Sequence, residues 1–196
     1  MAGQRPELTL VKLNKIYTRT GDGGSAGLVD GSRVSKSSAR MTAIGEVDEA
    51  NSAIGVAIAA LNAGKLTNQL RAIQNELFDL GADLATPEGV EGALRIVERQ
   101  VTRLEEEIDA MNEALAPLTS FILPGGSMAV SLIHQARCVV RRAERAAVAL
   151  AEAETINPRA LAYLNRLSDH LFVAARYLAA KEGGDVLWRP GATRAD

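Results

Sequence analysis

From residue 38 onward, apolar residues recur along the chain at the spacing of helices. Side chains three and four residues apart lie on one face of a helix, so this spacing predicts amphipathic helices. The predicted helices cover residues 38–61, 67–84, 93–111, 127–153 and 158–181. Thr67 is the expected N-cap of the second helix, and Asn157 is expected to cap the fifth, with Pro158 in its first position. The pattern predicts an all-α, five-helix bundle.

Two apolar series define faces that we expect to be buried. The second helix is predicted to bury Leu70, Ile73, Leu77, Phe78 and Leu80. The third helix is predicted to bury Leu94, Val97, Val101, Leu104, Ile108 and Met111. Three consecutive acids, Glu105 to Glu107, lie within the third helix. We interpret them as a solvated face rather than a metal site, because an amphipathic helix carries its charges opposite its packed side.

Four segments lie outside these helices. Residues 1–15 are expected to be a loosely held lead-in, and residues 16–37 a glycine-rich loop with neither a helical nor a strand period. Residues 115–126 are apolar but interrupted by proline, so we expect a non-helical connection that something must cover. The tail over residues 183–196 holds Trp188, which is expected either to dock onto something or to pack against the chain itself.

Composition narrows the class of protein. A chain of 196 residues suits a single domain, with its bundle over residues 38–182. Aromatic residues make up only 4% of the chain and alanine is the main apolar type, which favours closely packed helices. With 22 Lys+Arg against 24 Asp+Glu, no basic field indicates nucleic acid. Neither an apolar leader nor a bilayer-spanning run is present, so we expect a soluble, cytoplasmic protein without a membrane partner.

Cys138 is the only cysteine of the chain. A single cysteine excludes an internal disulfide and a cluster of thiolate metal ligands. We interpret this residue as a small buried hydrophobe rather than a nucleophile.

The predicted fourth helix carries arginines on one side. Arg137, Arg141 and Arg145 are four residues apart and share a column, with Glu144 flanking it and Arg142 further round the helix. Cations stacked at this spacing repel one another unless something anionic lies across them. The column therefore indicates a site for a multiply charged anion. The alternative is a solvated face whose arginines pair with acids of neighbouring helices.

The glycine-rich loop offers a second set of phosphate ligands. Residues 21–26 nominally satisfy a dinucleotide fingerprint, but the strand and helix that the fingerprint requires are missing, and no Walker lysine is present. Backbone N–H groups at glycines and hydroxyls of threonines can still converge on an anion. A flexible surface loop is the alternative. Together with Lys36, Asn165 and Asp169, the loop and the arginine column predict a nucleotide site outside the usual nucleotide folds.

Five motifs then identify a family resemblance. They are residues 15–22 (KIYTRTGD), 45–49 (GEVDE), 121–126 (FILPGG), 138–145 (CVVRRAER) and 164–169 (LNRLSD). In this order they resemble the PduO-type ATP:cob(I)alamin adenosyltransferases, and the resemblance extends from about Lys15 to the Trp-Arg-Pro-Gly tail. The resemblance implies a homotrimer of five-helix bundles, with each ATP site between the loop of one subunit and the arginine helix of its neighbour.

The resemblance also assigns residues. On the loop side the ATP contacts are expected at Thr18, Arg19, Thr20, Gly21, Ala26, Gly27 and Lys36. On the helix side they are expected at Arg137, Arg141, Arg142, Glu144, Arg145 and Asn165. Asp48 is expected to pair with Arg137 across the interface. This chain has Arg19 where the family often has lysine, and Ser25-Ala26 where a threonine pair is frequent, which removes one hydroxyl.

The implied reaction is attack of Co(I) of cob(I)alamin on the 5′ carbon of ATP, which gives adenosylcobalamin and releases triphosphate. Arg141, Arg137 and Asp48 are expected to serve this reaction, and Glu144 to hold Mg²⁺ directly or through water. Phe121 matches the aromatic residue that displaces the lower axial ligand of the corrinoid; an ordinary core aromatic is the alternative. The resemblance leaves open a reductase or an adenosylcobalamin-dependent enzyme as a protein partner.

Two rival functions follow from the residues alone. A non-catalytic helical bundle that binds a nucleotide or an acidic partner explains the arginines equally well. An arginine helix that binds nucleic acid is less consistent with the near-neutral charge.

Overall fold

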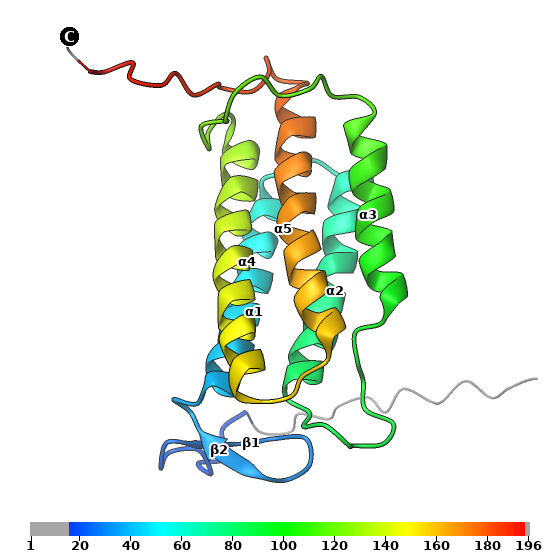
Figure 1. Cartoon of the computed structure of the whole chain (residues 1–196), viewed down its shortest axis with the longest axis vertical. Coiled ribbons are helices and arrows are strands. Elements are labelled where there is room, and N and C mark those ends of the chain that lie inside the picture. The colour runs from blue at the N-terminus through cyan, green and yellow to red at the C-terminus, as the bar shows by residue number, and fades with distance from the viewer. Residues whose placement is uncertain (1–15, 195–196) are drawn as a thin grey trace, which may run out of the picture.

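The computed structural model describes residues 16–194, which form a five-helix bundle with a small hairpin at one end (Figure 1). The helices are α1 (Ala39–Ala59), α2 (Lys65–Leu84), α3 (Glu98–Asn112), α4 (Met128–Ala153) and α5 (Pro158–Ala179). Consecutive helices run in opposite directions, and the connection before α4 crosses the end of the bundle (Figure 1). The predicted fold class is confirmed. The lead-in over residues 1–15, including Lys15 of the first motif, lies outside the described residues.

Capping residues fix the starts of three helices. The Ser38 and Ser127 hydroxyls accept hydrogen bonds from backbone N–H groups in the first turns of α1 and α4. Asn157 caps α5 in the same way, and Pro158 follows it in the first helical position. The predicted starts of these helices are therefore confirmed to within one residue. Between residues 16 and 194 no helix has both the length and the apolarity to cross a bilayer.

The predicted starts of the other two helices were wrong. α2 begins at Lys65, so Thr67 is buried in its first turn, where its hydroxyl donates to the Asn62 carbonyl at 2.6 Å. α3 begins only at Glu98, because Arg95 holds the preceding segment out of the helix. The Arg95 guanidinium donates to the carbonyls of residues 83, 86 and 87 and to the Asp83 carboxylate at 2.7 Å.

Three apolar residues that were predicted to be buried are exposed. Leu94 and Val97 precede α3 and are 56% and 52% exposed. Phe78 of α2 is 70% exposed, because the helix turns about 100° per residue and Leu77 and Leu80 occupy its packed face.

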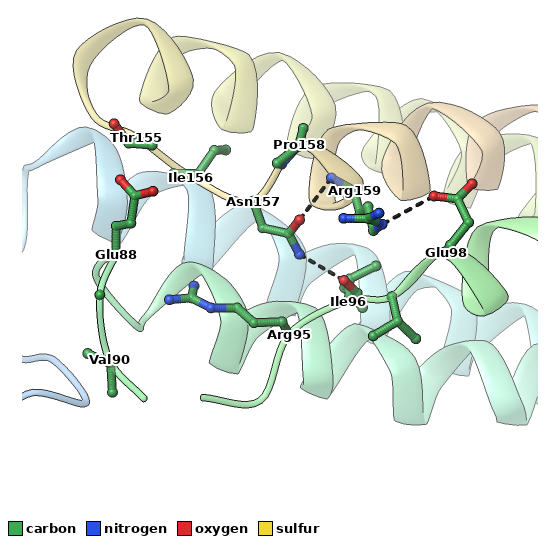
Figure 2. Close-up of a pocket in the computed structure, with 12 residues that line it drawn as sticks. Glu88, Val90, Arg95, Ile96, Glu98, Thr155, Ile156, Asn157, Pro158 and Arg159 are labelled. Carbon is green, nitrogen blue, oxygen red and sulfur yellow. Dashed lines mark hydrogen bonds and ion pairs between the residues drawn. The ribbon is translucent and has the colours of Figure 1, made fainter. Parts of the chain in front are cut away.

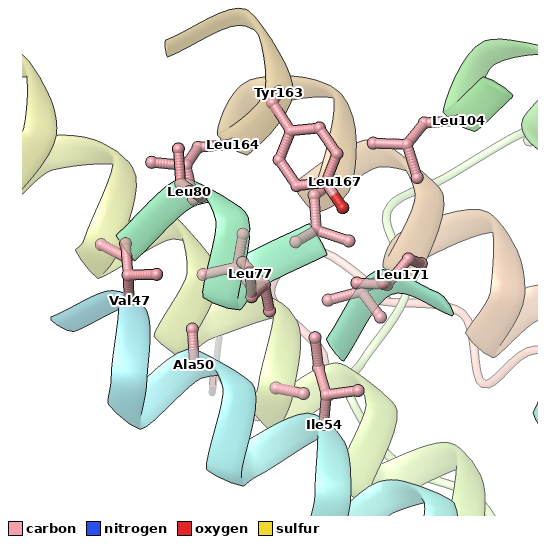
Figure 3. Close-up of a cluster of buried hydrophobic side chains, with 14 of the residues drawn as sticks. Val47, Ala50, Ile54, Leu77, Leu80, Leu104, Tyr163, Leu164, Leu167 and Leu171 are labelled. Carbon is pink, nitrogen blue, oxygen red and sulfur yellow. The ribbon is translucent and has the colours of Figure 1, made fainter. Parts of the chain in front are cut away.

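All five helices contribute large apolar side chains to the core. Leu77, Leu104 and Leu171 are fully buried and converge with Ile54 and Tyr163 (Figure 3). The contact between α1 and α4 uses alanines at its centre instead. They are Ala43, Ala50 and Ala57 of α1 and Ala136, Ala143 and Ala147 of α4. Small side chains let these two backbones approach closely.

The glycine-rich loop contains a hairpin that the sequence did not predict. Its strands, β1 (Ser25–Gly27) and β2 (Arg33–Ser35), are antiparallel, with Ala26 opposite Val34. Strands of three residues are too short to show an alternating pattern. Arg33 organises the loop by donating to the carbonyls of Thr20 and Ser25 at 2.8 and 3.0 Å. The hairpin lies at the end of the bundle where α4 finishes, opposite the 113–127 connection and the tail (Figure 1).

Candidate functional site

The arginine column lies on the outer side of α4, opposite its buried alanines. Arg141 and Arg145 are exposed, and Arg145 donates to the carbonyl of Arg141 at 3.0 Å. Among residues 16–194, neither of them nor Arg137 forms an ion pair with an aspartate or glutamate. The alternative that acids of neighbouring helices neutralise this column is therefore wrong within one chain. Three guanidinium groups remain available to an anion or to another copy.

Arg142, the next residue after Arg141, has a different environment. Its Nε donates to Glu46 at 2.5 Å and its Nη2 donates to Glu49, so it ties α4 to α1. The hydrogen bonds that Arg142 donates to Glu49 and Glu46 raise the pKa of Arg142 above its ordinary value. The structure thus places Arg142 in an ion-pair cluster with α1, and its contact with ATP stays a prediction.

Glu144 and Asn165 meet beside the column. The Asn165 amide donates to Glu144 Oε1 at 2.9 Å and thereby joins α5 to α4. Asp169, which the sequence placed near Asn165, instead pairs with Arg166 at 3.2 Å. No group of three or more potential metal ligands occurs among the described residues. A divalent cation here would therefore take one protein carboxylate, Glu144, and oxygens of a bound phosphate, which is the mode that Mg²⁺ favours.

Arg137 begins the column in a partly buried position. Its guanidinium carbon lies 5.2 Å from the centre of the Phe172 ring, and its buried Nε has no hydrogen-bond partner. His134 lies one turn earlier and is buried; its burial and the charge of Arg137 lower its pKa. Asp48 of α1 is exposed and has no hydrogen-bond or ionic partner within residues 16–194. The predicted pair of Asp48 with Arg137 does not occur inside one chain.

The loop presents hydroxyl and ammonium groups to solvent. The Thr18 and Thr20 hydroxyls lie 2.7 Å apart, and Arg19 between them has a φ of 63°, a left-handed conformation that is rare outside glycine. A Cβ at Gly21 would lie 3.0 Å from Lys36 Nζ, so glycine allows the lysine to sit against the backbone. Ala26 and Gly27 lie in β1 beside these groups. The loop thus presents groups that can bind an anion, and between residues 16 and 194 none of its cations forms an ion pair with a carboxylate.

The loop does not reach the arginine column of its own chain. Among the described residues, no hydrogen bond or ion pair joins residues 16–37 to Arg137, Arg141 or Arg145. Arg141 is twelve residues before the end of α4, roughly 18 Å along the helix from the end where the hairpin lies. The two sets of predicted ATP ligands are therefore separate within one copy.

Phe121 lies at the other end of the bundle and is 77% exposed. The interpretation of Phe121 as a core aromatic is therefore wrong for the single chain. Its ring centre lies 6.0 Å from that of Trp188, and the Trp188 N–H donates to the Phe121 carbonyl at 2.8 Å. A backbone bridge between Ile122 and Leu187 completes this contact. The tail thus packs on the apolar connection, and a cavity of about 980 Å³ lies between the two segments.

Another pocket, of about 620 Å³, lies where the segment before α3 meets the start of α5 (Figure 2). None of the predicted site residues lines it. Its polar groups already bind one another: Arg159 pairs with Glu98 at 3.2 Å, and Asn157 donates to the Ile96 carbonyl at 2.8 Å. The pocket is a product of the contacts that fix the ends of these helices.

Two residues near the site depart from the sequence analysis. Cys138, predicted to be buried, is exposed on α4. Arg33, which holds the loop together, was missed because its partners are backbone carbonyls and a serine, which leave no pattern in the sequence.

Comparison with known proteins gives one consistent result. The family model described as Cobalamin adenosyltransferase matches residues 16–178. A corrinoid adenosyltransferase of Mycobacterium tuberculosis is 51% identical over 190 residues, covering 94% of this chain and 97% of the relative. One of Bacillus subtilis is 48% identical over 177 residues, covering 88% and 91%.

Solved structures agree with the sequence relatives. A phenylalanine-to-alanine variant of the PduO-type ATP:corrinoid adenosyltransferase of Lactobacillus reuteri, complexed with cobalamin and ATP, has a TM-score of 0.85 and 41% identity, and the match covers 89% of this chain and 99% of that one. An arginine-to-lysine variant of that enzyme, complexed with ATP, has a TM-score of 0.83 and 42% identity, covering 89% and 100%. The chain belongs to the cobalamin adenosyltransferase family.

Proposed function

We propose that this chain acts as a single cobalamin adenosyltransferase domain, which transfers the 5′-deoxyadenosyl group of ATP to cob(I)alamin at a site formed by two copies of the chain. The family and the ATP and cobalamin bound by the Lactobacillus reuteri enzyme support the reaction. The observation that carries the proposed site is the column of three arginines without acidic partners on α4. The products are adenosylcobalamin and triphosphate.

Arg141 and Arg145 are proposed to bind the triphosphate. The two-pronged guanidinium group matches pairs of phosphate oxygens and stays charged at any physiological pH. When the bond between C5′ and oxygen breaks, the electron pair leaves with the triphosphate, and preorganised cations stabilise this developing charge. Neither arginine must first break a protein ion pair to do so.

The loop of a neighbouring copy is proposed to complete the ATP site. Thr18, Thr20 and Lys36 offer exposed donors, but no hydrogen bond or ion pair joins them to the column of their own chain among residues 16–194. A homotrimer with closed threefold symmetry lets each loop face the column of the next copy. In this arrangement Asp48 of one copy is proposed to pair with Arg137 of the next, which satisfies two groups that have no ionic partner among the described residues of one chain.

Glu144 is proposed to hold Mg²⁺ against the phosphates. When bound, the cation neutralises part of the charge on the leaving triphosphate. The Asn165 amide occupies one carboxylate oxygen of Glu144, which fixes the orientation of the group and leaves the second oxygen for the cation or its water.

The corrinoid is proposed to bind at the end of the bundle that carries Phe121. Co(I) attacks C5′ with its electron pair, so the Co–C bond forms as the C5′–O bond breaks. The protein supplies positioning rather than a nucleophile. The exposed ring of Phe121 can replace the lower axial ligand of the corrinoid with an apolar face, and the removal of an axial donor makes Co(II) easier to reduce.

An anaerobic assay tests the proposed reaction. Chemically reduced cobalamin and ATP with Mg²⁺ are mixed with the protein, and adenosylcobalamin is followed by absorbance and triphosphate by chromatography. We expect the two products in equal amounts. Saturable binding of ATP without either product would support the rival interpretation, a non-catalytic nucleotide-binding bundle. The cytoplasmic location and a reductase or adenosylcobalamin-dependent partner stay predictions.

A further inference from the structure

One buried arginine holds both segments that form the corrinoid end of the bundle. Arg176 lies in the last turn of α5, and its side chain is only 9% exposed. Its Nε donates to the Asp185 carboxylate at 3.0 Å, and its Nη2 donates to the Ala116 carbonyl at 2.9 Å. Asp185 belongs to the tail and Ala116 to the connection before α4. The same guanidinium therefore fixes two segments about 70 residues apart in sequence.

Asp185 and Ala116, the two anchor points bound by Arg176, precede Trp188 and Phe121 closely in sequence. Asp185 is three residues before Trp188, and Ala116 is five residues before Phe121. Beyond the anchors, the segments are joined by the single backbone bridge of Ile122 with Leu187 and by the Ser120 hydroxyl, which donates to the Trp188 carbonyl at 2.8 Å. An isolated pair of short strands is marginal in water. The contact therefore needs the anchors to keep it in place.

The backbone before Asp185 does not by itself hold the tail in place. Gly183 and Gly184 have φ values of 112° and 95°, in the region that glycine adopts readily. They turn the tail back over the bundle, but they do not hold it there. Asp185 has a half-buried position, and its charge acts on the buried His134 of α4 and opposes the lowering of its pKa. The side chains of Asp185 and Arg176 are only 15% and 9% exposed, so their ion pair is largely shielded from water.

We propose that Arg176 and Asp185 form a latch, the Arg176–Asp185 ion pair together with the Arg176–Ala116 hydrogen bond, which positions Phe121 and Trp188 for the corrinoid. The inference rests on the proposed function, because it assigns the latch a role in the corrinoid step. Arg176 and Asp185 are positioning residues: they act through Phe121 and do not touch the reacting atoms.

The variant Asp185→Asn tests the latch with little change in shape. It removes the carboxylate charge, and Glu182→Gln is the matched control, because Glu182 is an exposed acid three residues earlier without an ion pair in the described chain. Trp188 is the only tryptophan of the chain, so its fluorescence reports directly on the tail. A second variant, Arg176→Lys, keeps the charge but cannot bind two acceptors in the same fixed geometry.

We expect the emission of Trp188 in Asp185→Asn to move to longer wavelength and to become more accessible to acrylamide. The kcat/KM for cob(I)alamin should fall about 10-fold to 100-fold, which is the scale of a displaced positioning group, while the KM for ATP stays within about twofold. Four-coordinate Co(II) is the species expected when Phe121 displaces the lower axial ligand. Its fraction in the spectrum of the corrinoid bound to Asp185→Asn should fall as well. Asp185→Glu, which keeps a carboxylate, should show smaller changes than Asp185→Asn in each measurement. Glu182→Gln should match the unaltered chain.

The outcomes separate the latch from the proposed function. If the unaltered chain makes no adenosylcobalamin, the proposed function fails. If the unaltered chain is active and Asp185→Asn keeps its fluorescence, its kinetics and its Co(II) spectrum, the latch is refuted. A tail that is released while the corrinoid kinetics stay normal would also refute it, because Phe121 would then not depend on the latch.

Discussion

Two groups of arginines in this bundle have opposite surroundings. Between α2, α3 and α5, Arg103 pairs with both Glu76 and Glu107, and His170 and Tyr163 complete the cluster through hydrogen bonds of 2.8 and 2.7 Å to these acids. On α4, Arg137, Arg141 and Arg145 have no acid partner in the described chain. An arginine whose charge is satisfied within the chain holds helices together. An arginine that lacks such a partner is free to bind a ligand or another subunit.

Within the cluster around Arg103, neighbouring side chains shift one another's pKa values. Burial alone would raise the pKa of Glu107, but the hydrogen bond from His170 and the charge of Arg103 outweigh burial and lower it. Burial and the nearby Glu76 raise the pKa of Tyr163 well above its usual range, so its hydroxyl stays protonated and donates to Glu76. Each charge in this cluster is thus maintained by its neighbours.

The contrast recurs between adjacent residues of α4. Arg141 is exposed and has no acid partner within residues 16–194, whereas Arg142 binds Glu46 and Glu49 of α1. A helix turns about 100° per residue, so neighbours in sequence face different surroundings. This pair offers the most direct way to test the distinction, since the two residues have the same chemistry.

The largest effect is expected from Arg141→Ala. Loss of a preorganised cation from the triphosphate should lower kcat by about 100-fold to 1000-fold, while the melting temperature stays unchanged because no protein partner is lost. Steady-state kinetics and thermal unfolding measure the two effects. Arg142→Ala is the matched comparison and should lower the melting temperature, because it breaks the ion pairs with Glu46 and Glu49; its loss of turnover measures the predicted contact of Arg142 with ATP. Equal losses of turnover in both variants would contradict the view that Arg141 binds the ligand while Arg142 mainly holds α4 to α1.

A smaller effect, on stability rather than turnover, is expected from Arg103→Met. The substitution leaves Glu76 and Glu107 partly buried without their cation, and the free energy of unfolding should fall by about 3 kcal/mol. Urea denaturation gives this value. Activity measured well below the unfolding temperature should remain, because the cluster is far from the column. An unchanged urea midpoint would mean that the cluster contributes nothing to stability.

The smallest effect is a pH dependence of stability that comes from Glu107. The pKa of Glu107 is lower in the folded chain than in the unfolded chain, where it is about 4.3. The ionised carboxylate therefore stabilises the fold fully above the unfolded pKa, and this contribution is lost as the pH falls through the lower pKa of the folded chain. Urea midpoints measured between about pH 3 and 6 should therefore fall at the acid end. Glu107→Gln should be less stable at neutral pH and should have a flatter profile. The same slope in both proteins would assign the pH dependence to other carboxylates.

Local patterns in the sequence predicted the fold well. Ser127 and the pair Asn157-Pro158 mark the starts of α4 and α5 because a cap acts within one helical turn. The alanine face and the arginine column of α4 follow from the helical period in the same way. The family resemblance supplied the reaction, which the residue pattern alone did not distinguish from non-catalytic binding of a nucleotide.

Long-range contacts account for what the sequence did not predict. Arg142 finds its acids more than 90 residues away in sequence, and Arg176 binds a carbonyl 60 residues away. Arg95 delays the start of α3 through backbone carbonyls, which no side-chain pattern records. Asp48 and Arg137 form no ion pair among residues 16–194, so their proposed pairing across an interface rests on the family resemblance.

Complementation between two inactive variants is the most direct test of a site shared by two copies. Lys36→Ala damages the loop and Arg141→Ala damages the column; the two chains are coexpressed with different tags, and mixed trimers are assayed for adenosylcobalamin. If each site joins the loop of one copy to the column of the next, random assortment leaves about one quarter of the interfaces intact and restores about one quarter of the normal activity. Mixed trimers that are no more active than either variant alone would show that loop and column do not meet across an interface.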